Sequence, residues 1–94
     1  NKMMAIPRQD GEFSFYVIQH LWPGKEELES NWTFSTDNER YFTAMEPCWQ
    51  ENGNCGTYDL EKAVIALTSV QLNDQHNRKF RLVQITTSRK TIVV

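Results

Sequence analysis

The stretch Glu12-Phe-Ser-Phe-Tyr-Val-Ile-Gln-His-Leu21 decides the fold, because it is the clearest strand signal in the 94-residue chain. Aromatic and β-branched residues dominate it, and such residues favour extended backbone. Its side chains fall into two alternating sets. We expect one set to form the core face, Phe13, Phe15, Val17 and Leu21, and the other to form the sheet surface, Ser14, Tyr16, Ile18 and His20. Pro23-Gly24 then ends the strand in a turn.

The segments on either side of this strand are less regular. Residues 1–11 read as an irregular arm, because Pro7 and the Asp10-Gly11 pair break regular structure. Residues 25–30 are charged and predict one short helical turn. Residues 31–35 alternate Trp32 and Phe34 with polar neighbours, which predicts a second strand with both aromatic side chains in the core.

Two helices are predicted next. Thr36 or Asp37 can N-cap a short helix over residues 38–45, which Pro47 stops before a loop over residues 48–57. Asp59 is the expected N-cap of the main helix, residues 60–72, and residues 73–77 end it. Apolar residues at i, i+3, i+4, i+7 and i+10 form the expected core stripe of this helix: Leu60, Ala63, Val64, Leu67 and Val70.

The C-terminal residues complete the predicted sheet. Residues 79–87 are rich in β-branched residues and predict a strand, and Ser88-Arg-Lys90 predicts a turn before a last strand over residues 91–94. These two strands are expected to form an antiparallel hairpin. The chain therefore predicts an α+β fold: a three- to four-stranded antiparallel sheet with one main amphipathic helix packed on one face. Its length allows one domain, residues 1–94.

The charges are distributed unevenly, although the net charge is only −2. Residues 26–61 hold nine carboxylates and one cation, whereas the last 17 residues hold five cations and no carboxylate. This pattern predicts either separate acidic and basic faces or two halves that attract each other. No apolar run approaches the roughly 18 residues that a membrane span needs. No signal peptide is visible, although a cleaved one is compatible with the sequence.

The two cysteines, Cys48 and Cys55, are separated by six residues in the predicted loop. A disulfide between them is geometrically feasible, but two reduced cysteines, one packed beside Trp49, are the favoured interpretation. Structural zinc sites usually bring their ligands in tight pairs such as C-x2-C, and no such pair accompanies His20 and the predicted loop residue His76. The sequence therefore predicts no metal site and no cofactor.

Catalysis finds little support in the residues. The chain has no G-x-S-x-G, no P-loop and no H-E-x-x-H motif. Neither cysteine is expected at a helix N-terminus or beside a base. Glu26 and Glu27 are adjacent carboxylates in a polar run, whereas a catalytic acid needs burial to raise its pKa. We therefore predict that the protein is not an enzyme and has no catalytic residues.

Protein binding is the favoured function. Three tryptophans are many for this length, and Trp is enriched at interface hot spots. Trp22 and Trp49 each lie beside a turn or loop. The apolar strand over residues 91–94 invites pairing at a sheet edge, so a homodimer through that C-terminal edge strand is one option. The predicted partner-binding residues are Trp22, Trp49, Arg81, Arg89, Lys90, Glu26, Glu27 and Glu29.

Two alternatives involve nucleic acid. In the first, Arg81, Arg89 and Lys90 of the basic C-terminal hairpin contact phosphates, while Tyr16 or Trp22 stacks on bases. The negative net charge weakens this hypothesis, because nucleic-acid-binding domains are usually basic. In the second, the acidic segment 26–61 mimics nucleic acid, although such a mimic usually carries a much larger negative charge.

Four segments follow one another in a recognisable layout: F-x-F-Y-V-I at Phe13–Ile18, W-x-F-S-T-D at Trp32–Asp37, D-L-E-K-A at Asp59–Ala63 and K-F-R-L-V-Q-I-T-T at Lys79–Thr87. This layout resembles that of small phage-encoded accessory proteins. The resemblance includes no functional motif and assigns no residue roles. It implies a protein that binds and inhibits a host enzyme or defence complex in the bacterial cytoplasm, with that host protein as its partner.

Overall fold

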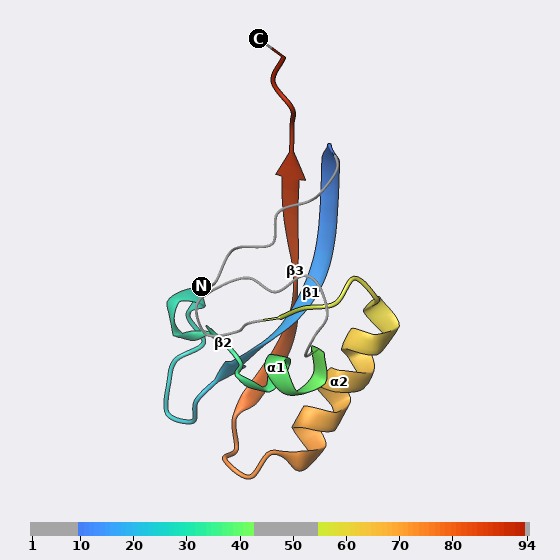
Figure 1. Ribbon diagram of the computed structural model, residues 1–94. Coiled ribbons are helices and arrows are strands. Elements are labelled where there is room, and N and C mark those ends of the chain that lie inside the picture. Colours follow the sequence, from blue (N-terminus) through green and yellow to red (C-terminus); the bar gives the residue numbers. More distant parts are fainter. Residues whose placement is uncertain (1–9, 43–54, 94) are drawn as a thin grey trace.

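The computed structural model describes residues 10–42 and 55–93, which form a three-stranded antiparallel sheet and two α-helices (Figure 1). The strands are β1 (Gly11–Leu21), β2 (Thr33–Phe34) and β3 (Lys79–Arg89), in the order β2-β1-β3. The helices are α1 (Asp37–Phe42) and α2 (Leu60–Asn73), and η1 (Glu29–Asn31) is a 3-10 turn. The predicted α+β class with one main helix is confirmed. Predictions for residues 1–9, 43–54 and 94 lie outside the described residues.

The β1–β3 ribbon replaces the predicted C-terminal hairpin. All 11 residues of β1 pair with β3, from Gly11 opposite Arg89 to Leu21 opposite Lys79. β1 begins at Gly11, and its first two residues pair with Arg89 and Ser88. This pairing keeps Ser88 and Arg89 extended, although a turn was predicted there from the sequence. Residues 91–93 are exposed and belong to no strand. The predicted turn and fourth strand are therefore wrong for these residues.

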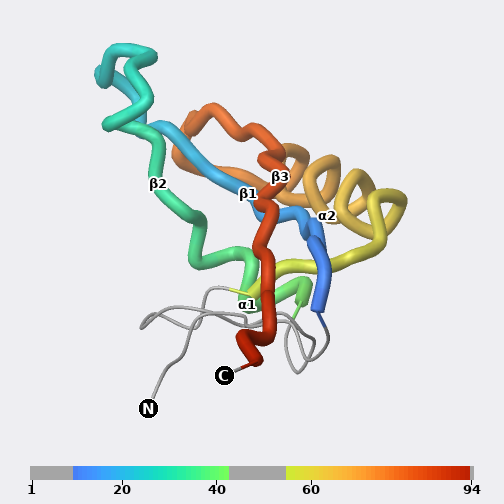
Figure 2. The backbone as a smooth tube through the Cα atoms, turned by 90° about the horizontal axis from the view of Figure 1, so that it is seen from above, coloured from blue at the N-terminus to red at the C-terminus, as the bar shows by residue number. Residues whose placement is uncertain are grey.

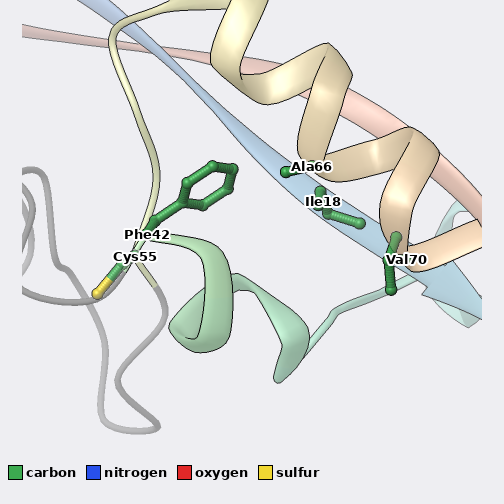
Figure 3. Close-up of a cluster of buried hydrophobic side chains, with 5 residues drawn as sticks. All are labelled: Ile18, Phe42, Cys55, Ala66 and Val70. Atoms are coloured by element: carbon green, nitrogen blue, oxygen red, sulfur yellow. The ribbon is translucent and has the colours of Figure 1, made fainter. Parts of the chain in front are cut away.

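Both faces of β1 are buried, so the predicted division into core face and surface face is wrong. α2 packs on the face that carries Ile18, which is fully buried, and His20, which is 7% exposed. Figure 3 shows Ile18 beside Ala66 and Val70 of α2, with Phe42 of α1 in the same cluster. Seen from above, α2 lies on the other side of the β1–β3 ribbon from β2 (Figure 2).

The opposite face of β1 buries a second apolar cluster. Phe15 and Val17 are 1% and 0% exposed and pack against Phe34, Val83 and Ile85. The predicted burial of Phe15 and Val17 is thus confirmed. Phe34 is half-buried and belongs to this cluster. Trp32 is also half-buried but lies outside the cluster, so its predicted core position is only partly confirmed.

The bounds of α2 agree closely with the prediction. Asp59 is its N-cap: one carboxylate oxygen accepts hydrogen bonds from the N–H groups of Glu61 and Lys62 at 3.0 and 3.3 Å. The helix ends at Asn73, one residue later than predicted. A side chain also caps α1, but it is Ser35, whose hydroxyl accepts the Asp37 N–H at 3.1 Å, and not Thr36 or Asp37.

The predicted stripe of α2 is confirmed at Ala63, Val70 and the partly buried Leu67, and is wrong at Leu60 and Val64. Ala63, Ala66 and Val70 are buried, whereas Leu60 and Val64 are 51% and 46% exposed. Alanine is small, so a face built on Ala63 and Ala66 lets the helix axis come close to the sheet. The larger Leu60 and Val64 side chains are consequently turned away from it.

β2 is short because the side chain of Asn38 takes over the pairing with β1. The fully buried amide of Asn38 accepts the Ile18 N–H and donates to the Ile18 carbonyl, both at 2.8 Å, and donates to the Ser35 carbonyl at 2.8 Å. Further along β1, Tyr16 exchanges two backbone hydrogen bonds with Thr57. A Cβ on Gly56 would lie 2.6 Å from the Tyr16 carbonyl oxygen, so this close approach requires glycine.

No helix within the described ranges is both long and apolar enough to cross a membrane.

Candidate functional site

α2 presents a second apolar face to solvent, roughly opposite the face that packs on the sheet. Its large members are Leu60, Val64, Ile65 and Leu72, which are 51%, 46%, 62% and 80% exposed. At about 100° per residue, Val64, Ile65 and Leu72 are directed roughly 125–155° away from the mean direction of the buried side chains, and Leu60 lies at the flank, about 90° away. A surface helix of a folded domain usually has one apolar face and one polar face. Glu61 and Gln71 lie between these side chains on the helix surface, so the face is apolar with two polar interruptions. Large apolar side chains gathered on the solvent side are typical of an interaction surface.

Thr68 completes this patch. It lies one turn after Val64 and one turn before Leu72, and its hydroxyl donates to the Val64 carbonyl at 2.9 Å. Because that hydrogen bond uses the hydroxyl, the methyl group is left to the surface. We refer to Leu60, Val64, Ile65, Thr68 and Leu72 as the α2 outer face. This face was not predicted from the sequence, although the apolar residues Ile65 and Leu72, outside the predicted core stripe, were a signal of it.

Two of the three predicted partner-binding residues of the acidic segment, Glu27 and Glu29, contact the start of β3. The guanidinium of Arg81 donates to both carboxylate oxygens of Glu29 at 2.8 and 2.7 Å and lies 4.4 Å from the Trp32 ring centroid. The Lys79 ammonium donates to Glu27 at 2.5 Å. The two charged parts of the chain thus attract each other, as one of the two interpretations predicted. The hydrogen bonds from Arg81 lower the pKa of Glu29.

The other predicted partner-binding residues lie elsewhere. Arg89 is 3.7 Å from a carboxylate oxygen of Asp10, whose pKa is lowered by hydrogen bonds from Thr91. Lys90 and Glu26 are exposed, and Trp49 lies outside the described residues. Arg81 and Arg89 are eight residues apart on one strand, a span of about 26 Å. The structure therefore does not gather the predicted residues into one site.

Arg78 is the centre of a polar cluster between the end of α2 and β1. Its guanidinium bonds one Asp74 oxygen at 2.8 and 2.9 Å and lies 3.4 Å from Asp37. It also lies 3.2 Å from Nδ1 of His20. Because arginine only donates, this ring nitrogen accepts, and the proton of the neutral imidazole is on Nε2. Burial, followed by the charge of Arg78, lowers the pKa of His20.

The same cluster holds Trp22 in place. Trp22 is 44% exposed, and its ring centroid is 5.4 Å from that of His20 and 5.7 Å from that of His76. The Arg78 guanidinium lies 5.2 Å from the Trp22 ring and 4.9 Å from the Phe80 ring. His76 is exposed in the loop before β3, as predicted. Trp22 thus remains available to a partner on part of its surface only.

An open pocket of about 530 Å³ lies beside Arg78, and its lining is mostly polar: Asp37, Arg40, Tyr41, Val70, Asn73, Asp74, Gln75, His76 and Arg78. The carboxylates of Asp37 and Asp74 are both directed at Arg78. Burial opposes the ionisation of Asp74, but hydrogen bonds from Arg78 outweigh it and lower the pKa of Asp74. The charges of this pocket therefore compensate one another. In the described part of the chain, no three His, Cys, Asp or Glu side chains are grouped to hold a metal ion.

Cys55 is 4% exposed and disulfide-bonded. The favoured prediction of a reduced cysteine is therefore wrong at this position. Cys48, the other cysteine of the chain, lies outside the described residues.

Comparisons of the chain with protein-family models, curated proteins and solved structures found no match.

Proposed function

We propose that the protein is a non-enzymatic binding module that inserts the α2 outer face into an apolar groove of a partner protein. The observation that supports this function is the exposure of four large aliphatic side chains on one 14-residue helix. Helix-in-groove recognition uses anchors four and seven residues apart, and Leu60 with Val64 and Ile65 with Leu72 have these spacings. Burying each anchor contributes about 1–2 kcal/mol.

The partner that the resemblance in layout favours is a bacterial host enzyme or defence complex, which the bound helix inhibits by occupying its groove. Such a partner places the protein in the host cytoplasm. Disulfides persist mainly in oxidising compartments, so the bond at Cys55 is open to reduction in such a cytoplasm. Binding should therefore be tested with and without reductant.

The test is capture from a bacterial lysate with the folded protein and two variants. Ile65→Gln/Leu72→Gln removes apolar surface and keeps good helix formers. The control, Lys25→Gln, alters an exposed side chain that lies outside α2 and is not among the candidate binding residues. We expect the wild type and the control to retain the same partner in stoichiometric amounts and the α2 variant to lose it. A partner that the α2 variant retains, or no partner from repeated captures with folded protein, would contradict the proposal.

A further inference from the structure

The backbone hydrogen bonds of β1 show which groups of β3 are directed to the open edge of the sheet. Tyr16 and Ile18 of β1 direct their N–H and C=O groups away from β3, toward Thr57 and toward Asn38 and Ser35. Along a strand these groups alternate between the two sides, so odd-numbered residues of β1 bond to β3. Their partners on β3 are also odd-numbered. The even-numbered residues of β3 therefore point their backbone groups outward: Phe80, Leu82, Gln84, Thr86 and Ser88.

None of the described residues pairs with this outer edge of β3. Natural sheets protect such edges with proline, bulges, very short strands or charged side chains. β3 is 11 residues long, contains neither proline nor glycine, and pairs with β1 without interruption. Its cations lie at the ends, and residues 82–88 carry no charge. This is the pattern of a strand that pairs with another chain.

We propose that two copies of the chain pair their β3 strands antiparallel along this edge, with the twofold axis at Gln84. In this register Gln84 meets Gln84 of the second copy, Leu82 meets Thr86, and Phe80 meets Ser88. Each outward-pointing residue then faces another outward-pointing residue, as a hydrogen-bonded pair requires. The two three-stranded sheets become one continuous sheet.

Charge and apolar character along the edge favour a second copy as the occupant. The uncharged residues 82–86 meet themselves, and Arg81 lies opposite the uncharged Thr87, so no two charges face each other between the two ends of the strand. Val83 meets Ile85 of the second copy, and this apolar pair lies on the sheet face that carries the cluster of Phe15 and Val17. At the ends Lys79 meets Arg89, and each already has a carboxylate partner, Glu27 and Asp10 respectively, which reduces their repulsion.

The shape of the molecule also favours an antiparallel copy. α2 packs against Phe80 and Leu82 at the start of β3. The other half of the β1–β3 ribbon projects beyond α2 (Figure 1). Antiparallel pairing puts the helix-covered half of each copy beside the projecting half of the other, so the two α2 helices are offset and do not collide.

The position of Gln84 on the axis provides a sharp test, because any charge placed there meets itself. We expect the wild type to form a dimer in sedimentation velocity. Gln84→Lys and Gln84→Glu should each weaken association at least about tenfold through like-charge repulsion, and an equimolar mixture of the two should restore it as a heterodimer. Gln71→Lys, which adds the same charge at an exposed position of α2, should associate like the wild type.

Three results would overturn this proposal. The first is a wild type that stays monomeric up to about 1 mM, a concentration at which half of the chains would be paired if the Kd were about 1 mM. The second is a dimer that Gln84→Lys leaves unchanged, since it would use another surface. The third is a mixture of the Lys and Glu variants that fails to associate. Ile65→Gln/Leu72→Gln should leave the dimer intact, which separates this inference from the proposed function of α2.

Discussion

His20 is a neutral imidazole held against a cation. It is 7% exposed, and its Nδ1 accepts from Arg78 at 3.2 Å. Burial and the charge of Arg78 lower its pKa in the folded state, whereas in the unfolded chain it titrates near its ordinary value of about 6.5. Below about pH 6.5 the unfolded state therefore binds more protons than the folded state. His20 therefore contributes its full stabilisation above about pH 6.5. This contribution is lost as the pH falls from about 6.5 to the lower pKa that His20 has in the folded protein.

We expect the free energy of unfolding, measured by urea titration, to decrease as the pH falls below about 6.5. His20→Asn should remove this slope, and the control His76→Asn, at an exposed position, should keep it. A second decrease should begin near pH 4, about where Asp10, Glu29 and Asp74, whose pKa values are lowered, start to bind protons in the unfolded chain. A slope near pH 6 that persists in His20→Asn would assign it to another group.

The contrast between His20 and Gly24 shows which single-residue features a sequence can predict. The Pro23-Gly24 turn is local, and Gly24 adopts the positive φ of 85° that favours glycine. The burial of His20 depends on Arg78, which is 58 residues away. Alternation along β1 assigns His20 to a face but contains no information on what covers that face. The sequence therefore predicted the turn and missed the burial.

Among the elements, α1 and β1 are joined by the buried amide of Asn38. Its three hydrogen bonds to Ile18 and Ser35 are all 2.8 Å long. Asn38→Ala removes all three bonds and leaves the buried Ile18 N–H without a partner, whereas the carbonyls of Ile18 and Ser35 each keep one backbone donor. We expect this to lower the free energy of unfolding by about 3 kcal/mol. Asn31→Ala, which removes one exposed hydrogen bond to the Glu26 carbonyl, should cost less than about 1 kcal/mol in the same urea titration. Equal losses would show that Asn38 does not connect the two elements.

The bounds of α2 were predictable and its orientation was not, for different physical reasons. Asp59 caps the helix through its nearest neighbours along the chain, so the start is encoded locally. The choice between two apolar faces is made by the sheet. Apolar periodicity placed Leu60 and Val64 in one stripe with Ala63, but the buried face is turned toward Ala66, which leaves Leu60 and Val64 exposed. The length of β3 was likewise set by β1, its partner across the ribbon, and not by its own residues.

For the whole molecule, the ion pairs on the surface say more about how it can bind a charged ligand than the net charge of −2 does. Lys79 and Arg81 are each 52 residues from the carboxylates that they contact, Glu27 and Glu29. The uneven charge distribution was readable in the sequence, but the fold decided whether it became two faces or a set of ion pairs. Two of the cations proposed for phosphate contacts, Arg81 and Arg89, have carboxylate neighbours. Phosphate would have to compete with these carboxylates.

This competition predicts how nucleic-acid binding should respond to two variants of equal net charge. Glu27→Gln/Glu29→Gln removes the carboxylates beside Lys79 and Arg81, whereas Glu39→Gln/Glu61→Gln removes two exposed carboxylates on α1 and α2. In mobility-shift titrations at about 50 mM salt, we expect the wild type and the second variant to bind duplex DNA weakly and the first variant to bind more tightly. Each phosphate newly contacted should steepen the dependence of log K on log salt by about 0.9.

If both variants gain equally in affinity for DNA, net charge and not local pairing controls the binding. If the wild type already binds tightly at physiological salt, the nucleic-acid hypothesis is favoured over helix docking, because the paired cations would then be available to phosphate.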